Sequence, residues 1–232
     1  MSQQVTMTIL EHLAELRDRL LRAIIALAVG VVAGTFFAPR VLKFLVAPLG
    51  EQTPIAIAPT EAPAVYFKVS LVIGLVIAMP VIVYQLFRFV APGLEPQEKR
   101  YLFIGAPIAA ISFAAGVAFA ALVLIPAALP FLRGFLANIV EQRYSINRYI
   151  SFVSTVLLWA GLVFETPLVM FFLAKLGVAT PRGFAQARRI VVIGAALGAA
   201  VITPTTDPIN MLLIMGPFLL LYELGIVLAR FT

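Results

Sequence analysis

The sequence has no cysteine, one histidine and few charged residues. Without cysteine, disulfides, a thiolate nucleophile and a cysteine-based metal site are all excluded. The single imidazole, His12, cannot form a histidine cluster. The motifs H-E-x-x-H and G-x-S-x-G and the P-loop are also absent, which excludes the enzymes that depend on them. We therefore expect no enzymatic activity, no cofactor and no metal site.

Charged residues make up only 12% of the 232 residues, whereas 62% are apolar and the mean hydropathy is +1.05. A soluble domain has about 45–50% apolar and about 25% charged residues. A soluble enzyme, a disordered protein and a DNA-binding module are therefore disfavoured. The net charge is +6. In a membrane protein, such an excess of Lys and Arg usually orients the loops across the bilayer and does not indicate nucleic-acid binding. The composition predicts an integral membrane protein that contacts the lipid bilayer and binds no nucleic acid.

Charged residues divide the chain into six apolar stretches that are long enough to cross a bilayer. A helical span needs about 20 apolar residues, whereas membrane-barrel strands of about 10 residues alternate in polarity. The stretches are continuously apolar, so we predict an all-α, polytopic membrane protein with one integral domain over residues 1–232. The expected spans are approximately 22–39, 66–89, 101–132, 149–175, 190–204 and 208–229.

The distribution of Lys and Arg predicts the orientation. Eleven of them flank the spans on the side of the two termini, five flank the other side, and Lys68 is ambiguous. Because Lys and Arg concentrate in cytoplasmic loops, both termini are predicted to be cytoplasmic. The first span is taken as retained rather than as a signal peptide, since 22 residues with three acids precede it and no clear cleavage site follows.

Prolines predict irregular helices. Pro107, Pro126 and Pro130 are expected to kink the long third span, and Pro217 to interrupt the sixth. The fifth and sixth spans are short, with a tight turn between them at 203–208. Short spans thin the bilayer locally or lie behind neighbouring helices.

The segment before the first span predicts a helix with an acidic stripe of Glu11, Glu15 and Asp18 at positions i, i+4 and i+7. Two interpretations remain open. The pairs Glu15–Arg19 and Asp18–Arg22 would make it an ordinary solvated face. Alternatively, the stripe binds a cationic ligand.

The first inner loop, 89–100, carries Glu95 and Glu98 beside Lys99 and Arg100. Taken alone, this is an ordinary connection between helices. It lies on the same predicted membrane side as the acidic stripe, so both could contact one cytoplasmic ligand.

Glu165 lies near the middle of the fourth span, two residues before Pro167. A charge at the centre of a span costs about 2.5–3.5 kcal/mol on insertion scales, so such a residue faces protein or water and is usually functional. The alternative is a protonated or hydrogen-bonded structural glutamate. Pro167 removes a backbone hydrogen bond and predicts a kink beside it.

Three further features have simple structural interpretations. Asp207 is placed to cap the sixth helix ahead of Pro208. Glu223 can be satisfied by Arg230 or by headgroup water. The spacing of Gly194 and Gly198 predicts a helix-packing surface.

Six motifs, in order along nearly the whole chain, resemble the TatC family of the twin-arginine translocation system. They are His12-Leu-x-Glu15-Leu-Arg17-x-Arg19-Leu, Ala47-Pro48-Leu, Tyr84-Gln85-x-x-x-Phe89-x-Ala91-Pro92-Gly93-Leu94 with Glu98-Lys99-Arg100, Phe164-Glu165-x-Pro167, Thr203-Pro204-x-x-Asp207-Pro208 and Tyr222-Glu223-x-Gly225. Two departures are Phe87, where the family commonly has Trp, and Asn210-Met211, which replaces a more polar stretch.

The resemblance implies a concave, glove-like receptor in the cell inner membrane that binds Arg-Arg signal peptides of folded proteins at its cytoplasmic face. By position, Glu15 and Glu98 resemble the family's twin-arginine contacts, with Arg17, Phe89 and Arg100 on the same surface. The implied partners are TatA- and TatB-type single-span proteins and further copies of this chain, and transport would use the proton-motive force.

The resemblance also implies roles for three other positions. Glu165 resembles an intramembrane polar residue of the concave face, and Pro48 and Asp207 match outer-face positions. Two other functions compete with a receptor. A small-solute or proton-coupled transporter would suit Glu165, but the chain has no inverted repeat. An inert scaffold would leave the acidic inner surface without a purpose.

Overall fold

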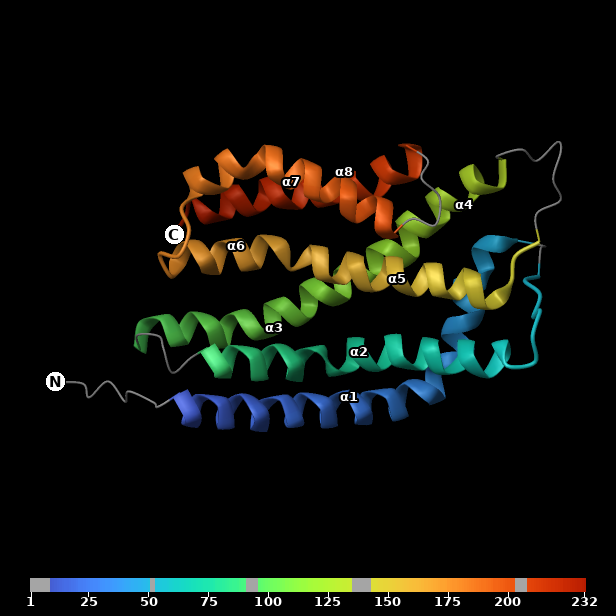
Figure 1. The fold of residues 1–232 in the computed structure, drawn as a ribbon, viewed down its shortest axis with the longest axis horizontal. Helices are drawn as coiled ribbons and strands as arrows, with labels where there is room; N and C mark the ends of the chain where they lie inside the picture. Colours follow the sequence, from blue (N-terminus) through green and yellow to red (C-terminus); the bar gives the residue numbers. More distant parts are fainter. Residues whose placement is uncertain (1–8, 51–52, 91–95, 135–142, 203–207) are drawn as a thin grey trace.

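The structure is a computed structural model that describes residues 9–50, 53–90, 96–134, 143–202 and 208–232, with the backbone alone for 9, 90, 96–102, 131, 133, 202, 209 and 210. In these ranges the regular elements are all helical (Figure 1). They are α1 (Ile9–Val46), η1 (Ala47–Leu49), α2 (Glu61–Val90), α3 (Pro96–Phe119), η3 (Ala120–Leu124), α4 (Ile125–Gly134), α5 (Ile146–Phe164), α6 (Thr166–Lys175), α7 (Pro181–Ile202) and α8 (Pro208–Ala229).

The described helices include six that are long and apolar enough to cross a membrane, which confirms the predicted all-α, six-span class. They are Leu10–Leu49, Glu61–Phe89, Phe103–Pro130, Ile146–Lys175, Pro181–Val201 and Met211–Ala229. Figure 1 shows that α1 begins and α8 ends at the same end of the bundle. This end is called the terminal end below, and the other is called the distal end.

A π-helical turn, η3, separates α3 from α4 in the third span. Here the Ile125 N–H donates to the Ala120 oxygen, one residue farther back than in an α-helix. Pro126 follows at once, and its ring would clash with the carbonyl of Leu122 in a regular helix. The wider turn relieves that clash. Pro107 and Pro130 lie inside α3 and α4, which continue past them.

The prediction that Pro217 interrupts the sixth span is wrong, because α8 runs unbroken from Pro208 to Ala229. The preceding residue is Gly216. A side chain before proline normally clashes with the proline ring in the helical conformation, and glycine has no Cβ to clash. The helix therefore accepts Pro217 at the cost of one backbone hydrogen bond.

The fourth span is broken at Glu165, as Pro167 predicts. α5 ends at Phe164 and α6 begins at Thr166, with Pro167 in its first turn. Glu165 connects the two helices, since its N–H donates to the Leu162 oxygen and its carbonyl accepts from Val169, at 3.1 and 2.9 Å. The break therefore places the Glu165 side chain at a helix junction.

Glycines bring α1 and α2 into backbone contact. A Cβ added at Gly30 would lie 2.5 Å from the Gly74 oxygen, and one at Gly34 would lie 2.5 Å from the Ser70 oxygen. These distances are too short for any side chain. Helices in lipid associate through such close packing of small residues. We call this contact the α1–α2 seam.

α7 and α8 lie side by side and end short of α5 toward the distal end (Figure 1). Both have 22 residues, and α7 begins at Pro181, well before the expected start of its span at 190. The helix-packing surface predicted from Gly194 and Gly198 has no helix against it in the described chain. No atom of the described chain would lie within 4 Å of a Cβ at either position.

Candidate functional site

Glu15 lies in α1 at the terminal end and is mostly buried, with 16% of its side chain exposed. Its Oε1 accepts from Nε of Arg19 at 2.9 Å and also from Nη2 of the same residue. The predicted pair Glu15–Arg19 is therefore present. The other oxygen, Oε2, is buried and has no hydrogen-bond partner among the described residues. One half of the carboxylate thus remains available to a donor.

The end of α2 lies against Glu15. The ring of His12 stacks on that of Phe89, with centroids 4.3 Å apart and an interplanar angle of 16°. His12 Nδ1 is 3.9 Å from the free Oε2 of Glu15. Gln85 Oε1 accepts from Arg19 at 3.5 Å. The structure therefore brings Phe89 and Glu15 together through the side chains of His12 and Gln85.

Arg17 turns away from this cluster. Its Nε and Nη2 donate to Asp18 Oδ1 at 3.0 and 2.8 Å, on an exposed surface. Asp18 thus pairs with Arg17, and the expectation that it pairs with Arg22 is wrong. Arg17 shares the helix of Glu15, but the two side chains have different partners.

The remaining predicted residues of this surface lie on α3. Glu98 and Arg100 are in its first turns, at the terminal end of the bundle, and the structure describes their backbone only. At the distal end, Pro48 lies in η1. Asp207 lies outside the described residues, so its predicted capping role stays a prediction.

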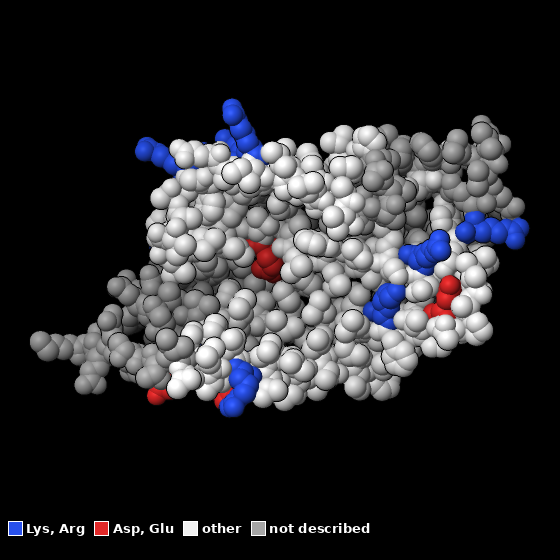
Figure 2. Space-filling model, viewed as in Figure 1, with Lys and Arg blue, Asp and Glu red and all other residues white. Residues whose placement is uncertain are grey.

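Glu165 is half-buried at the α5–α6 junction, and its Oε1 is buried with no hydrogen-bond partner in the described ranges. Figure 2 shows charged side chains toward both ends of one face and an acidic side chain in a hollow of its uncharged middle. A carboxyl group in such a place attracts a polar partner, because lipid offers none.

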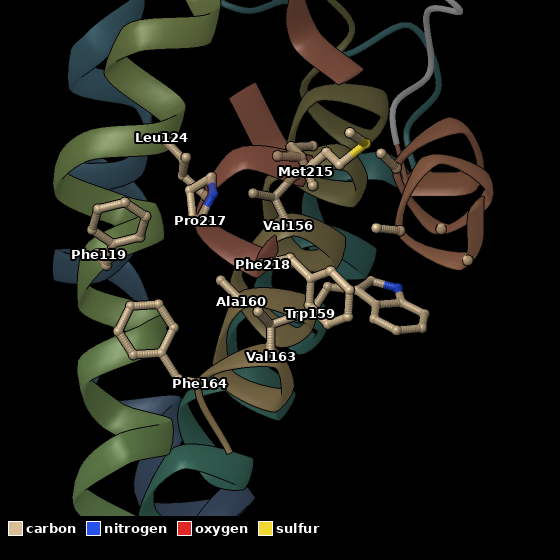
Figure 3. Close-up of a pocket in the computed structure, with 15 residues that line it drawn as sticks. Phe119, Leu124, Val156, Trp159, Ala160, Val163, Phe164, Met215, Pro217 and Phe218 are labelled. Carbon is tan, nitrogen blue, oxygen red and sulfur yellow. The ribbon is translucent and has the colours of Figure 1, made fainter. Parts of the chain in front are cut away.

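An apolar pocket of about 110 Å³ adjoins this junction, between α5, α7 and α8. Phe164, the neighbour of Glu165, lines it together with Trp159 and Phe218 (Figure 3). Gly194 and Gly198 form part of its wall, and their missing side chains help to leave the space open. Sequence reasoning missed the pocket, although the two glycines were its one signal.

α7 and α8 are linked by polar contacts near the terminal end. Arg188 Nε and Nη2 donate to the two carboxylate oxygens of Glu223, each at 2.7 Å. The Tyr222 hydroxyl donates to the Phe184 carbonyl at 2.7 Å. Arg188 is therefore the hydrogen-bonded partner of Glu223, in place of the expected Arg230. Among the described residues, no three His, Asp or Glu side chains converge as metal ligands would.

Comparison with known proteins decides the family. Residues 11–217 match the family model of TatC, described as Sec-independent protein translocase protein. The chain belongs to the TatC family. It is 38% identical to the Sec-independent protein translocase protein TatC of Deinococcus radiodurans, over 95% of this chain and 84% of that protein. It is 36% identical to the chloroplastic TATC of Arabidopsis thaliana, over 97% of this chain and 67% of that protein.

The fold agrees with this assignment. A crystal structure of the twin-arginine translocase receptor TatC superposes with a TM-score of 0.85 at 37% identity, over 95% of this chain and 99% of that one. A second TatC crystal structure, in DDM, gives a TM-score of 0.87 at the same identity, over 94% and 99%. The TatC-family chain is thus a multi-pass membrane protein of protein translocation, a transport protein rather than an enzyme. The solute-transporter and scaffold alternatives are set aside.

Proposed function

We propose that this TatC-family chain is the receptor for twin-arginine signal peptides and nucleates the translocon that exports their folded cargo. We place it in the cell inner membrane with both termini, and hence the Glu15 surface, in the cytoplasm. The excess of Lys and Arg near the terminal end supports this orientation. The crystal structures that it resembles are of twin-arginine translocase receptors.

Oε2 of Glu15, buried and without a hydrogen-bond donor in the described part of the chain, is the observation that carries this proposal. A buried carboxylate oxygen without a donor is costly, and a donor that reaches it is bound strongly. Arginine suits the position because its planar guanidinium offers several N–H groups in a fixed geometry, which the ammonium of lysine does not. The first oxygen already shows this recognition, since Arg19 binds it through two nitrogens.

Glu98 would supply the second carboxylate for an arginine pair, with Arg100 near it on α3. Arg17, which pairs with Asp18, would lie at the edge of this surface. The beginning of α3, which carries Glu98, lies at the same end of the bundle as Glu15 (Figure 1). The stacked His12 and Phe89 rings form an apolar wall beside Glu15. Such a wall excludes water and strengthens a charged hydrogen bond.

Beyond the arginine pair, we place the apolar part of the signal peptide and the partner helices along the hollow at Glu165. Pro48 and Asp207 would act at the outer face. The partners are TatA- and TatB-type single-span proteins and further copies of this chain. The sequence has no P-loop for ATP hydrolysis, so we expect transport to require the proton-motive force.

Binding of a labelled twin-arginine peptide to the purified full chain tests the receptor function. Glu15→Gln should weaken binding by about 1.5–3 kcal/mol, the contribution of a hydrogen bond to a charged group. Asp18→Asn is the matched control, because Asp18 is an exposed acid on the same helix that pairs with Arg17. A peptide with Lys-Lys in place of Arg-Arg should bind wild type more weakly. Equal affinity of Glu15→Gln and wild type at low salt would refute the proposal.

The dependence on partners is tested separately by reconstitution. Vesicles that contain this chain alone should bind cargo without transporting it, even when a proton gradient is imposed. Adding the single-span partners should start transport. Transport by the chain alone would contradict this part of the proposal and leave the peptide-binding result unaffected.

A further inference from the structure

A group of polar side chains joins α2 to α5 toward the distal end. The ammonium of Lys68 donates to Asn147 Oδ1 at 3.0 Å and to Ser151 Oγ at 2.5 Å. The Ser151 hydroxyl donates to the Asn147 carbonyl at 2.7 Å, so its lone pairs are left for Lys68. We call Lys68, Asn147 and Ser151 the Lys68 cluster; Arg148 is the residue after Asn147 in α5. Asn147 and Ser151 thus fix the position of the Lys68 ammonium group.

The positive charge of the Lys68 cluster has no acidic partner in the described part of the chain. Both acceptors of Lys68 are neutral, and the Arg148 side chain is exposed. Glu61, at the start of α2, is engaged by the Ser145 hydroxyl at 3.1 Å and by the Ile57 N–H at 3.2 Å. In Figure 2, blue side chains outnumber red ones toward the distal end of this face. A half-buried cation whose described partners are all neutral is stabilised by an added negative charge.

With the start of α2 placed at the membrane surface, the cluster lies close to the lipid headgroups. Lys68 lies seven residues into α2, about 10 Å along the axis. The headgroup layer on each side of the hydrocarbon core is about 5–8 Å thick, and a lysine side chain extends toward it. Phe67 and Leu71, beside Lys68 on α2, are 62% and 50% exposed. Leu71 lies about one turn deeper than Lys68 and Phe67 lies beside it, so acyl chains would contact exposed apolar side chains next to and below the cation.

We propose that the Lys68 cluster binds the phosphate of an anionic phospholipid in the leaflet at the distal end. The third N–H of Lys68 and the NH₂ group of Asn147 would supply donors, the exposed Arg148 next to Asn147 in α5 would add a second positive charge, and the phosphate would supply a negative charge. A lipid is favoured over free phosphate because exposed apolar side chains continue from the charged group. The site lies at the end of the bundle opposite Glu15 and has no part in binding the arginine pair.

Lipid retention tests this site. The purified full chain is reconstituted in nanodiscs of phosphatidylcholine with a minor fraction of phosphatidylglycerol. It is then extracted gently, and the lipids that remain bound are measured by native mass spectrometry. Wild type should be enriched in phosphatidylglycerol. Lys68→Met keeps the apolar stem and should lower that enrichment by about tenfold, the loss of one charge-assisted hydrogen bond. Arg148→Gln should lower it less.

Lys43→Met is the matched control, because Lys43 is an exposed cation in the last turn of α1 at the same end of the bundle. It should retain the wild-type enrichment. If Lys68→Met does not fold, Lys68→Arg and Ser151→Ala replace it, with enrichment kept in the first and reduced in the second.

Three results would overturn the proposal. In the first, Lys68→Met and wild type retain the same lipids. In the second, wild type shows no preference for phosphatidylglycerol, as expected if an acidic partner helix supplies the counter-ion. In the third, excess inorganic phosphate displaces the lipid from wild type, which would make this a site for free phosphate.

Discussion

Two glycine pairs with the same spacing have opposite surroundings in this protein. A Cβ at Gly30 or Gly34 on α1 would lie 2.5 Å from a backbone oxygen of α2. A Cβ at Gly194 or Gly198 on α7 would meet nothing within 4 Å in the described chain. The first pair allows two backbones to touch, and the second forms the wall of a pocket. Two glycines spaced by four residues therefore predict a smooth helix face. Whether that face packs against another backbone or lines a pocket depends on the opposing helix.

The contact between α1 and α2 and the contact between α7 and α8 are built differently. In the most apolar stretch of α1, only 11% of the residues are buried, so this helix is largely open to lipid. Its attachment to the rest of the bundle therefore depends on the α1–α2 seam. α7 is even more open, at 6%, and is tied to α8 near the terminal end by Arg188 with Glu223 and by Tyr222. Close packing thus fixes the first pair of helices along its length. Polar links, together with apolar contacts of Phe184, Ala185 and Val191, fix the second pair near one end, away from the pocket.

The largest effect is expected at the seam. In Gly74→Ala, the new Cβ would lie 2.5 Å from Val31 N and 2.6 Å from Val31 Cα, so backbone must move. We expect the free energy of unfolding to fall by about 3 kcal/mol, the upper range for overpacking. Unfolding of the purified chain in mixed micelles with increasing SDS measures this. Gly194→Ala is the control, and an equal loss in both variants would remove the distinction between the two regions.

A smaller loss is expected in Gly225→Ala, where α8 meets α6. The added Cβ would lie 2.5 Å from Met170 Sδ and 3.2 Å from Pro167 Cα. Because the methionine side chain is flexible, we expect a loss of about 1 kcal/mol. The same substitution in a Met170→Val background should cost less than in wild type. An equal cost in both backgrounds would show that the backbone of α6 is the obstacle.

A change of opposite sign is expected on α7. Gly198→Ala meets no obstacle and replaces glycine in a helix interior, so the free energy of unfolding should rise by about 0.5–1 kcal/mol. The same SDS titration measures it. A loss of unfolding free energy as large as that of Gly74→Ala would show that another helix packs against Gly198 in the folded protein. The comparison between the two regions would then fail.

The smallest effect on stability is expected for Glu165→Ala beside the pocket. Removing a carboxyl group with an unpartnered buried oxygen relieves a desolvation cost that balances the lost contacts. The folded protein should be retained, while transport in cells and crosslinking to partner helices at this depth should fall. Glu165→Gln keeps a hydrogen-bonding group and should be milder. Degradation of the Ala variant would show that Glu165 is structural.

Features that depend on neighbours along the chain were predictable from the sequence. The six spans follow from the gaps between charges, and the pair Glu15–Arg19 follows from the helical period. The break before Pro167 follows from the N–H that proline lacks. The family and its function were predictable as well, because the six motifs are spread over nearly the whole chain.

Features that depend on the register between helices were not predictable. Arg188 and Glu223 are 35 positions apart, and nothing local indicates that they face each other. The partner of Gly30 and the pocket beside Gly198 require the same knowledge of the opposing helix. Pro217 was misjudged for another reason, since Gly216 before it removes the steric conflict that interrupts most helices.

The α1–α2 seam also bears on how the chain is made. Its two helices are consecutive, and a single connection of 47–60 joins them. Such a hairpin closes a short loop, so it can assemble while the ribosome is still synthesising α3. The contact between Gly225 and Met170 cannot form until the last span has been made. Synthesis from the N-terminus therefore completes the rigid part of the receptor first and the open, pocket-lined part last.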